Sequence, residues 1–226
     1  MTLSYRFPSE PAAVLFDLDG TLIDSAPDLA AAVNYLRLQR GLSVLPLAQL
    51  RPFASHGARG LINAGLGVTP EDSDFEELRV AFLNYYEVHS AVHTRLFAGM
   101  DAVLDLLERR QIPWGIITNK HERFTQPIIK ALGLDERAAV IVCGDTTEYA
   151  KPHPAPMLYA AEQLGLLAEC LIYVGDDERD IEAARAANYM SALAAAYGYC
   201  QSDEVGHWQA DAVLIQPIDL LLLLGN

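Results

Sequence analysis

Apolar residues fall into two patterns along the chain. A first apolar run at residues 14–16 ends in acidic residues, and from residue 99 onward short apolar runs alternate with segments of helical spacing. Short apolar strands separated by helices of about ten residues are typical of a parallel sheet covered on both faces. After the first strand, the pattern predicts strands at residues 114–118, 140–143, 171–175, 190–194 and 212–215, and helices at residues 102–109, 124–132, 155–164 and 181–187.

The stretch between the first strand and residue 98 has a different character. Its apolar residues follow helical spacing, and Pro27 suits the first turn of a helix. We expect no strand between Ile23 and Phe97. The pattern predicts an α/β fold: a Rossmann-like parallel-sheet core of residues 1–24 and 98–226, with an α-helical insert at residues 25–97. The expected helices of this insert are residues 25–40, 61–66 and 75–88.

Composition narrows the class of protein. The 226 residues are 51% hydrophobic, enough for a sizeable core. With 30 acidic and 16 basic residues the formal charge is −14, which argues against nucleic acid or an anionic membrane as partner. The apolar run at residues 220–224 is too short to span a bilayer and predicts a last core helix. The sequence gives no indication of oligomeric state.

The cysteines and the N-terminus suggest a location. Cys143, Cys170 and Cys200 lie far apart, which favours buried, reduced thiols and a cytoplasmic protein. The first residues, MTLSYRFPSEP, show no basic-then-apolar signal pattern.

Polar side chains follow four of the predicted strands. The stretch VLFDLDGTLIDS places Asp17 and Asp19 directly after the first strand, with no Lys or Arg nearby in the sequence. Ligands of open α/β sheets bind at the carboxyl ends of the strands, so these residues form a candidate site. The other strand ends contribute Thr118, Asn119 and Lys120, then Lys151 in the loop CGDTTEYAKPHP, then Asp176, Asp177 and Asp180 in GDDERD.

These residue types suit phosphoryl transfer. Clustered carboxylates repel one another, and a divalent cation such as Mg²⁺ relieves the repulsion; Asp17 and Asp176 can supply its carboxylate ligands. Asp17 can serve as a covalent nucleophile, and Asp19, two residues on, as general acid and then general base. Phosphoryl oxygens can be held by Thr118, by Lys151 and by backbone amides around Gly20 and Asn119.

The motifs DLDGT, Thr-Asn, Lys-Pro and GDDERD together resemble those of the haloacid dehalogenase-like hydrolase superfamily. The resemblance covers essentially the whole chain, including an insert where the family carries a helical cap. It implies Asp17 as nucleophile, Asp19 as acid/base, and Thr118 and Lys151 as phosphate ligands. It also implies Mg²⁺ held by Asp17, the main-chain carbonyl of Asp19 and Asp176.

Two further acidic residues lie in the last motif. The resemblance implies that Asp180 positions the waters of the metal and Lys151. Asp177 stands where many relatives carry Ser, and it could compete as a metal ligand.

Within the superfamily the chain resembles the phosphoglycolate phosphatase group. Longer stretches, among them HSAVHTRLFAGM, WGIITNK, GDDERDIEAARAA, YGY and HWQADAVL, resemble N-acetylmuramic acid 6-phosphate phosphatases. The resemblance implies an Mg²⁺-dependent phosphatase acting on a small, carboxylate-bearing phosphorylated metabolite. The dehalogenases of the superfamily lack the second Asp of the DxD motif, so Asp19 argues against that activity. A phosphonatase would need a cap lysine to form a Schiff base, and the stretch between Ile23 and Phe97 contains no Lys.

Other functions and residues stay open. Arg59 and His56, in the cap segment SHGARGL, are candidates for reading the substrate, although a solvated helix-start loop would look the same. Lys120 could add positive charge near the substrate. We expect His121 at the rim of the site rather than in catalysis. One alternative is a signalling module that accepts a phosphoryl group without hydrolysing an ester. Such a module needs neither Asp19 nor a cap, so both features argue against it. A second alternative, a phosphosugar mutase, is excluded by the sequence only weakly.

Overall fold

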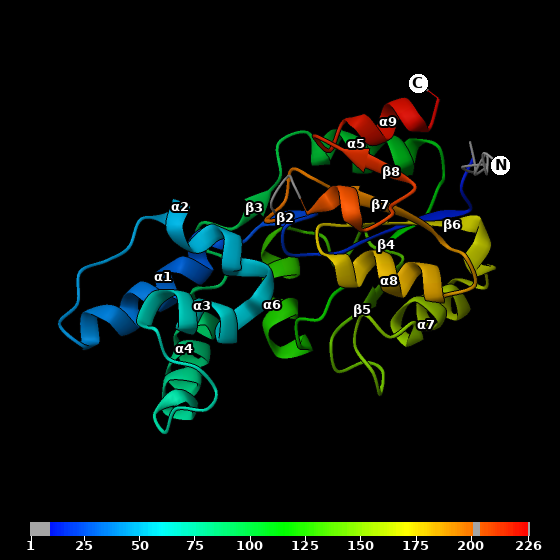
Figure 1. The fold of residues 1–226 in the computed structure, drawn as a ribbon. Coiled ribbons are helices and arrows are strands. Elements are labelled where there is room, and N and C mark those ends of the chain that lie inside the picture. The colour runs from blue at the N-terminus through cyan, green and yellow to red at the C-terminus, as the bar shows by residue number, and fades with distance from the viewer. Residues whose placement is uncertain (1–9, 201–203, 226) are drawn as a thin grey trace.

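The computed structural model describes residues 10–200 and 204–225, and a six-stranded parallel sheet lies at its centre (Figure 1). The order across the sheet is β5-β4-β1-β6-β7-β8. This arrangement confirms the predicted α/β class. The strands are β1 (Ala13–Phe16), β4 (Trp114–Ile117), β5 (Val140–Val142), β6 (Leu171–Gly175), β7 (Ser191–Ala195) and β8 (Ala212–Leu214).

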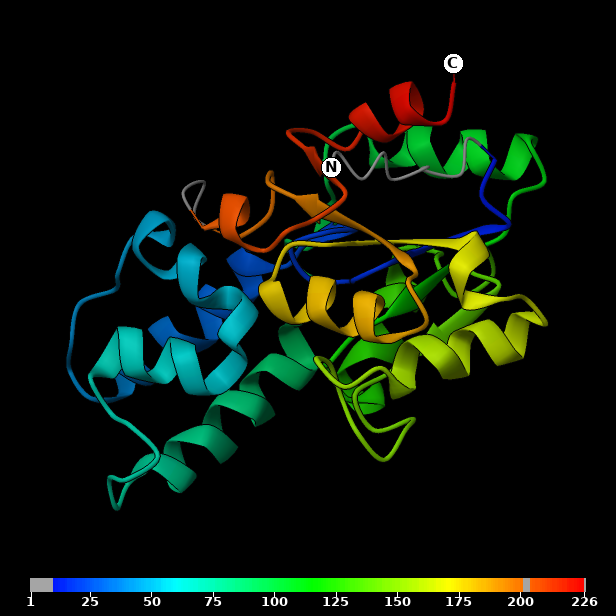
Figure 2. The same ribbon diagram turned by 45° about the vertical axis from the view of Figure 1, so that its right-hand side comes forward.

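Helices cover both faces of the sheet because successive residues of each strand point to opposite sides. Val14 and Phe16 of β1 join one apolar cluster, whereas Ala13 and Leu15 join another. All four residues are fully buried, which explains why the strand reads as a continuous apolar run. The first cluster includes α5 (Met100–Arg109), α6 (Glu122–Ala131) and α9 (Asp219–Leu223), and the second includes α7 (Ala155–Leu164) and α8 (Glu178–Ala186). Figure 2 shows α7 and α8, in yellow-green and gold, on the opposite side of the sheet from α5 and α9.

The chain between β1 and α5 forms a group of helices beside the sheet, drawn in blue to teal in Figure 1. Its first and last helices pack against each other, and α3 packs on α1. The division into core and cap at residues 25 and 97 stays a prediction. The elements are α1 (Ala26–Gln39), α2 (Leu47–Leu50), the 3₁₀ turn η1 (Arg51–His56), α3 (Gly57–Leu66) and α4 (Phe75–His89).

A two-stranded antiparallel ribbon joins these helices to the sheet. It consists of β2 (Ile23–Asp24) and β3 (Arg95–Leu96), with Ile23 opposite Leu96. The prediction that no strand lies between Ile23 and Phe97 is therefore wrong. Strands of two residues are too short to show the period-two alternation by which strands are recognised.

The prediction of buried thiols holds for one cysteine. Cys143 is buried, Cys200 is half-buried and Cys170 is exposed; all three are free. Cys170 ends the surface 3₁₀ turn η2 (Ala168–Cys170) just before β6, so the apolar run that follows it does not cover it. Of the helices in the described part of the chain, none combines the length and apolar content needed to cross a bilayer.

Candidate active site

Three strand ends meet at one edge of the sheet. Asp17 follows β1, Thr118 follows β4 and Asp176 follows β6. The backbone N–H of Asp17 donates to the Val174 carbonyl at 2.8 Å, and that of Thr118 donates to the Val142 carbonyl at 2.9 Å. These bonds extend the strand ladders by one residue, so the backbone fixes where both side chains begin. In the sheet β1 lies between β4 on one side and β6 on the other, so the strand order changes direction here. Ligands of open α/β sheets bind at the carboxyl ends of the strands at such a point.

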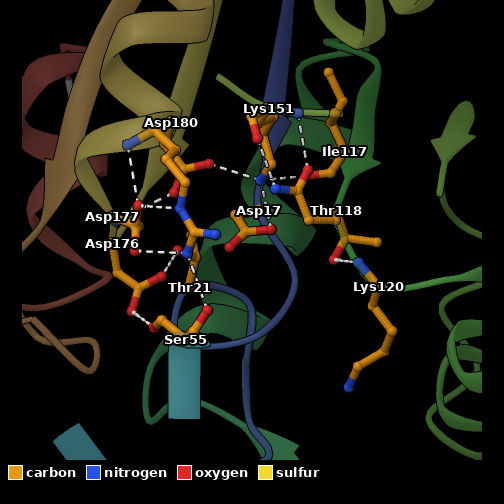
Figure 3. Close-up of polar contacts among 12 residues, drawn as sticks. Asp17, Thr21, Ser55, Ile117, Thr118, Lys120, Lys151, Asp176, Asp177 and Asp180 are labelled. Carbon is orange, nitrogen blue, oxygen red and sulfur yellow. Dashed lines mark hydrogen bonds and ion pairs between the residues drawn. The ribbon is translucent and has the colours of Figure 1, made fainter. Parts of the chain in front are cut away.

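Lys151 is a buried cation at the centre of this edge (Figure 3). Its Nζ lies 2.8 Å from Asp17 Oδ1 and 2.6 Å from Asp180 Oδ1. It also donates to the Ile117 carbonyl at 3.0 Å and lies 2.8 Å from the Tyr173 hydroxyl. Burial alone would lower the pKa of Lys151, but the two carboxylates raise that pKa above its ordinary value. The ammonium is therefore held both charged and in place.

The side chain of Asn119 clamps the backbone of Lys151. Its Oδ1 accepts from the Lys151 N–H at 2.9 Å, and its Nδ2 donates to the Lys151 carbonyl at 2.9 Å. Gly144 packs so closely that a Cβ there would collide with the backbone carbonyl of Asn119. The phosphate role predicted for Asn119 can therefore use only its backbone, because its side chain is already committed to Lys151.

Asp17, Asp176 and Asp180 form a buried acidic cluster, with one oxygen of each within 4.8 Å of the others. Asp176 accepts from the Tyr199 backbone N–H at 2.9 Å, and the Thr21 hydroxyl lies 3.4 Å away. In the described structure, only neutral groups donate to Asp176. Asp17 and Asp176 lie close enough to share one cation, and their role as its ligands stays a prediction.

The charges of this cluster are poorly compensated. Burial raises the pKa of Asp17 to about 7, although Lys151 opposes the rise. Burial, with the neighbouring charges of Asp17 and Asp180, also raises the pKa of Asp176 well above its ordinary value. A buried carboxylate without a cationic partner fits a hard divalent cation, which prefers oxygen ligands. The donor set therefore suits Mg²⁺.

Two glycines bring the backbone against Asp176. A Cβ at Gly20 or at Gly198 would collide with the Asp176 side chain. Gly20 also has φ +86°, a left-handed conformation that favours glycine. The glycine of DLDGT is thus required by both space and conformation.

Two side chains from separate parts of the chain hold the Asp19 carboxylate. Its Oδ1 accepts from Lys120 Nζ at 2.7 Å and from the Ser25 hydroxyl. Lys120 Nζ also lies 2.8 Å from the hydroxyl of Tyr86, on α4. Folding thus supplies the counter-charge that the sequence around Asp19 lacks.

Asp177 and Asp180 cap the start of α8. The Asp177 side chain accepts from the Arg179 N–H at 3.0 Å, and the Asp177 N–H donates to Asp180 Oδ2 at 3.1 Å. Arg179 also binds Asp177 through Nε at 2.7 Å and Nη2 at 2.8 Å, and donates to the Ser55 carbonyl at 2.9 Å. Asp177 is thus engaged by a guanidinium and a helix start, and it lies outside the acidic cluster. The structure gives no support to Asp177 as a competing ligand.

A cavity of about 480 Å³ opens between the strand ends and helices α1, α3 and α4. His56 lines it, and its role in reading the substrate stays a prediction. Arg59 does not line the cavity: it is exposed and lies near Glu71. The cavity instead receives Arg79 from α4. Its lining also includes Asp17, Asp19, Thr118, Lys120, Arg123, Lys151 and Arg179.

Comparisons with known proteins identify the family. The model of the haloacid dehalogenase-like hydrolases matches residues 14–194. The chain belongs to the haloacid dehalogenase-like hydrolases. It is 46% identical over 211 residues to a phosphoglycolate phosphatase of Xanthomonas campestris, covering 93% of this chain and 95% of that one.

Two further members of this hydrolase family add detail. The chain is 40% identical over 215 residues to an N-acetylmuramic acid 6-phosphate phosphatase of Pseudomonas aeruginosa, covering 95% of each chain. A crystal structure of a predicted phosphoglycolate phosphatase from Haemophilus somnus superposes with a TM-score of 0.82 at 26% identity, covering 95% of this chain and 98% of that one. The family resemblance stated from the motifs is confirmed.

Several residues of the site escaped the sequence pattern. Tyr173 reads as one more apolar strand residue, yet its hydroxyl contacts Lys151. Tyr86 reads as packing, yet it contacts Lys120. Arg179 and Tyr199 lie in the stretches GDDERD and YGY, but the sequence pattern assigned neither residue a role. A polar atom on an otherwise buried strand or helix residue, as in Tyr173 and Tyr86, is the one local signal available, because a buried hydroxyl usually has a hydrogen-bond partner.

Proposed function

We propose that this protein is an Mg²⁺-dependent phosphatase that hydrolyses a small, carboxylate-bearing phosphomonoester through an aspartyl-phosphate on Asp17. The observation that carries the proposal is the buried cluster of Asp17, Asp176 and Asp180, of which Asp17 and Asp180 bind Lys151 and line the cavity together with it. The family and the names of its members place the reaction among phosphate ester hydrolyses.

The reaction proceeds in two displacements. A carboxylate oxygen of Asp17 bonds to phosphorus as the ester oxygen leaves, and Asp19 gives that oxygen its proton. Water, losing a proton to Asp19, then attacks the phosphoryl group, which releases inorganic phosphate and restores the Asp17 carboxylate. Lys151 and Thr118 hold the phosphoryl oxygens, and Asn119 fixes the backbone from which Lys151 extends.

Asp17, Asp176 and the carbonyl of Asp19 would hold Mg²⁺, with Asp180 positioning its waters. When bound, the ion neutralises phosphate and carboxylate charge. Asp180 also fixes Lys151, because its Oδ1 accepts from Nζ at 2.6 Å.

The substrate is proposed in two forms. Several relatives are named phosphoglycolate phosphatase, which favours phosphoglycolate as the first candidate. The cavity favours N-acetylmuramic acid 6-phosphate as the second: about 480 Å³ is far more than a two-carbon acid needs, and a sugar phosphate would fill it better. Apolar Leu29, Phe82 and Phe124 in the lining suit a sugar face.

A phosphate-release assay tests the proposal. Enzyme is incubated with 2-phosphoglycolate, N-acetylmuramic acid 6-phosphate or glucose 6-phosphate, with Mg²⁺ or with EDTA. We expect Mg²⁺-dependent release, greatest for one of the two carboxylate-bearing esters, and a loss of at least about 10³-fold in Asp17→Asn. Metal-independent release, or full activity in Asp17→Asn, would contradict the proposal. Isomerised hexose phosphate without free phosphate would instead indicate a mutase.

We also propose a cytoplasmic location and a small phosphorylated metabolite as the partner. Three free cysteines support the location.

A further inference from the structure

Lys120 makes contacts that neither phosphate binding nor the metal site uses. Its side chain is only 10% exposed, and its Nζ lies 2.7 Å from Asp19 Oδ1 and 2.8 Å from the Tyr86 hydroxyl. Nζ also lies 4.9 Å from the centre of the Tyr86 ring. Lys120 follows β4, Asp19 follows β1 and Tyr86 lies on α4, so three separate elements meet at one ammonium.

These contacts fix one face of Asp19. The Ser25 hydroxyl donates to the same oxygen, Oδ1, that accepts from Lys120. Two hydrogen bonds to Oδ1 restrain the orientation of the carboxylate, and the hydrogen bonds from Lys120 and Ser25 both go to Oδ1 rather than Oδ2. A proton donor must be aimed at the departing oxygen to be effective. The geometry therefore points to an orienting role for the ammonium.

Tyr86 makes this orientation depend on helix α4. The ring is 2% exposed and packs near Phe82 and Phe124, with centroids 6.2 Å from each. Burial raises the pKa of Tyr86 to about 12, so the phenol stays neutral and its oxygen accepts from Lys120. Lys120 is thus held between a rigid ring and a carboxylate.

We propose that Lys120 is a positioning residue that orients Asp19 towards the leaving oxygen, and that this orientation depends on helix α4 through Tyr86. The proposal rests on the proposed function, in which Asp19 protonates the departing group. Lys120 itself need not touch the substrate. Its loss should therefore weaken proton donation rather than binding.

Leaving groups of different basicity separate these two effects. Phenyl phosphate and p-nitrophenyl phosphate have similar shapes, but phenolate is much the more basic leaving group and depends more on a proton donor. The ratio kcat/KM reports steps up to the first irreversible one, here departure of the phenol, so the later hydrolysis of the intermediate does not enter. A positioning defect should appear as a selective loss in kcat/KM for phenyl phosphate.

The variants are Lys120→Met, Tyr86→Phe and the control Lys130→Met, an exposed lysine on α6. For Lys120→Met we expect kcat/KM for phenyl phosphate to fall about 10- to 100-fold more than for p-nitrophenyl phosphate, a share of what acid catalysis contributes. Tyr86→Phe, which keeps the charges and the ring, should show a selective loss of about three- to tenfold. Lys130→Met should match wild type with both esters.

The outcomes separate this inference from the proposed function. Equal losses for both esters, or a rise in KM alone, would overturn the positioning role and make Lys120 a substrate ligand. If Lys120→Met does not fold, Tyr86→Phe decides in the same way. Absence of phosphate release by wild type, or full activity in Asp17→Asn, would overturn the proposed function as well.

Discussion

The side chain of Asn119 holds the backbone of another residue of the site, Lys151. Its amide forms two hydrogen bonds, both 2.9 Å long, with the backbone of Lys151. These bonds tie the end of β4 to the loop that carries the lysine. The Lys151 loop is therefore fixed relative to the carboxyl end of β4. This fixes the direction in which the Lys151 side chain extends into the site.

Replacing Asn119 should therefore affect folding as well as catalysis. Asn119→Ala leaves the Lys151 N–H and carbonyl without these partners, and we expect the free energy of unfolding to fall by about 1–3 kcal/mol. Urea denaturation measures this, together with kcat/KM for p-nitrophenyl phosphate. Asn63→Ala, at an exposed position on α3, should leave both unchanged. An Asn119→Ala protein of wild-type stability but reduced activity would instead favour a direct role in phosphate binding.

The sequence predicted the residues at the strand ends but not the contacts among them. Asp17, Thr118 and Asp176 could be predicted because each directly follows an apolar run, which is a local pattern. The partners of Lys120 could not, since Asp19 is 101 residues and Tyr86 34 residues away. The sequence also could not show that Arg59 lies away from the cavity, because which residues of a helix face a cavity depends on how that helix packs.

At the scale of elements, Tyr199 links the acidic cluster to the start of α1. Its backbone N–H donates to Asp176, and its hydroxyl oxygen accepts from the N–H groups of Ser25 and Ala26 at 2.7 and 2.9 Å. Asp24 of β2, which lies 3.2 Å from the same hydroxyl, is bound by both terminal nitrogens of Arg51. The ribbon and the first turn of α1 are therefore anchored through one phenol.

Removing this hydroxyl should loosen the first turn of α1. In Tyr199→Phe two backbone N–H groups lose their acceptor, so amide hydrogen exchange in residues 23–30 should become faster, with exchange in α8 unchanged. Mass spectrometry of peptides after deuterium labelling gives the measurement. Tyr197→Phe is a matched control that removes one hydrogen bond, to the Thr21 carbonyl, and should have a smaller effect. Equal exchange in all three proteins would mean that the phenol does not anchor this turn.

Elements were predicted better than their bounds. The predicted strand 171–175 and helix 155–164 agree with β6 and α7, whereas α6 begins two residues and α8 three residues before the predicted starts. Both early starts are polar first turns, Glu122–Arg123 and Glu178–Asp180, which apolar spacing does not reveal. For α8 the capping box explains the start.

For the whole molecule, electrostatics should link stability to pH and metal. Burial raises the pKa of Asp17 from its ordinary 3.8 to about 7, and it raises the pKa of Asp176 as well. Between these values the folded state binds more protons than the unfolded state, so the stability of metal-free protein should fall as pH rises from about 4 to about 7. The proposed Mg²⁺ would bind the deprotonated cluster, so adding it should restore stability most above about pH 7.

Thermal denaturation with and without Mg²⁺, at about pH 5.5 and about pH 8, measures both effects. Asp176→Asn removes one of the buried charges, so its metal-free stability should depend less on pH and its gain from Mg²⁺ should be smaller. Metal-free stability that rises with pH, or an equal gain from Mg²⁺ in the variant, would contradict this view of the cluster.

The place of β1 in the sheet has a consequence for protein synthesis. β1 is made first, yet it lies between β4 and β6, and β6 is completed only at Gly175. Until then the ribosome holds a nascent chain whose central strand has an open edge, and whose Asp17 has not yet met Asp176. A truncated product ending before β6 therefore lacks Asp176, one of the two carboxylates proposed to hold the metal, so no translation fragment of that length can carry a complete catalytic centre.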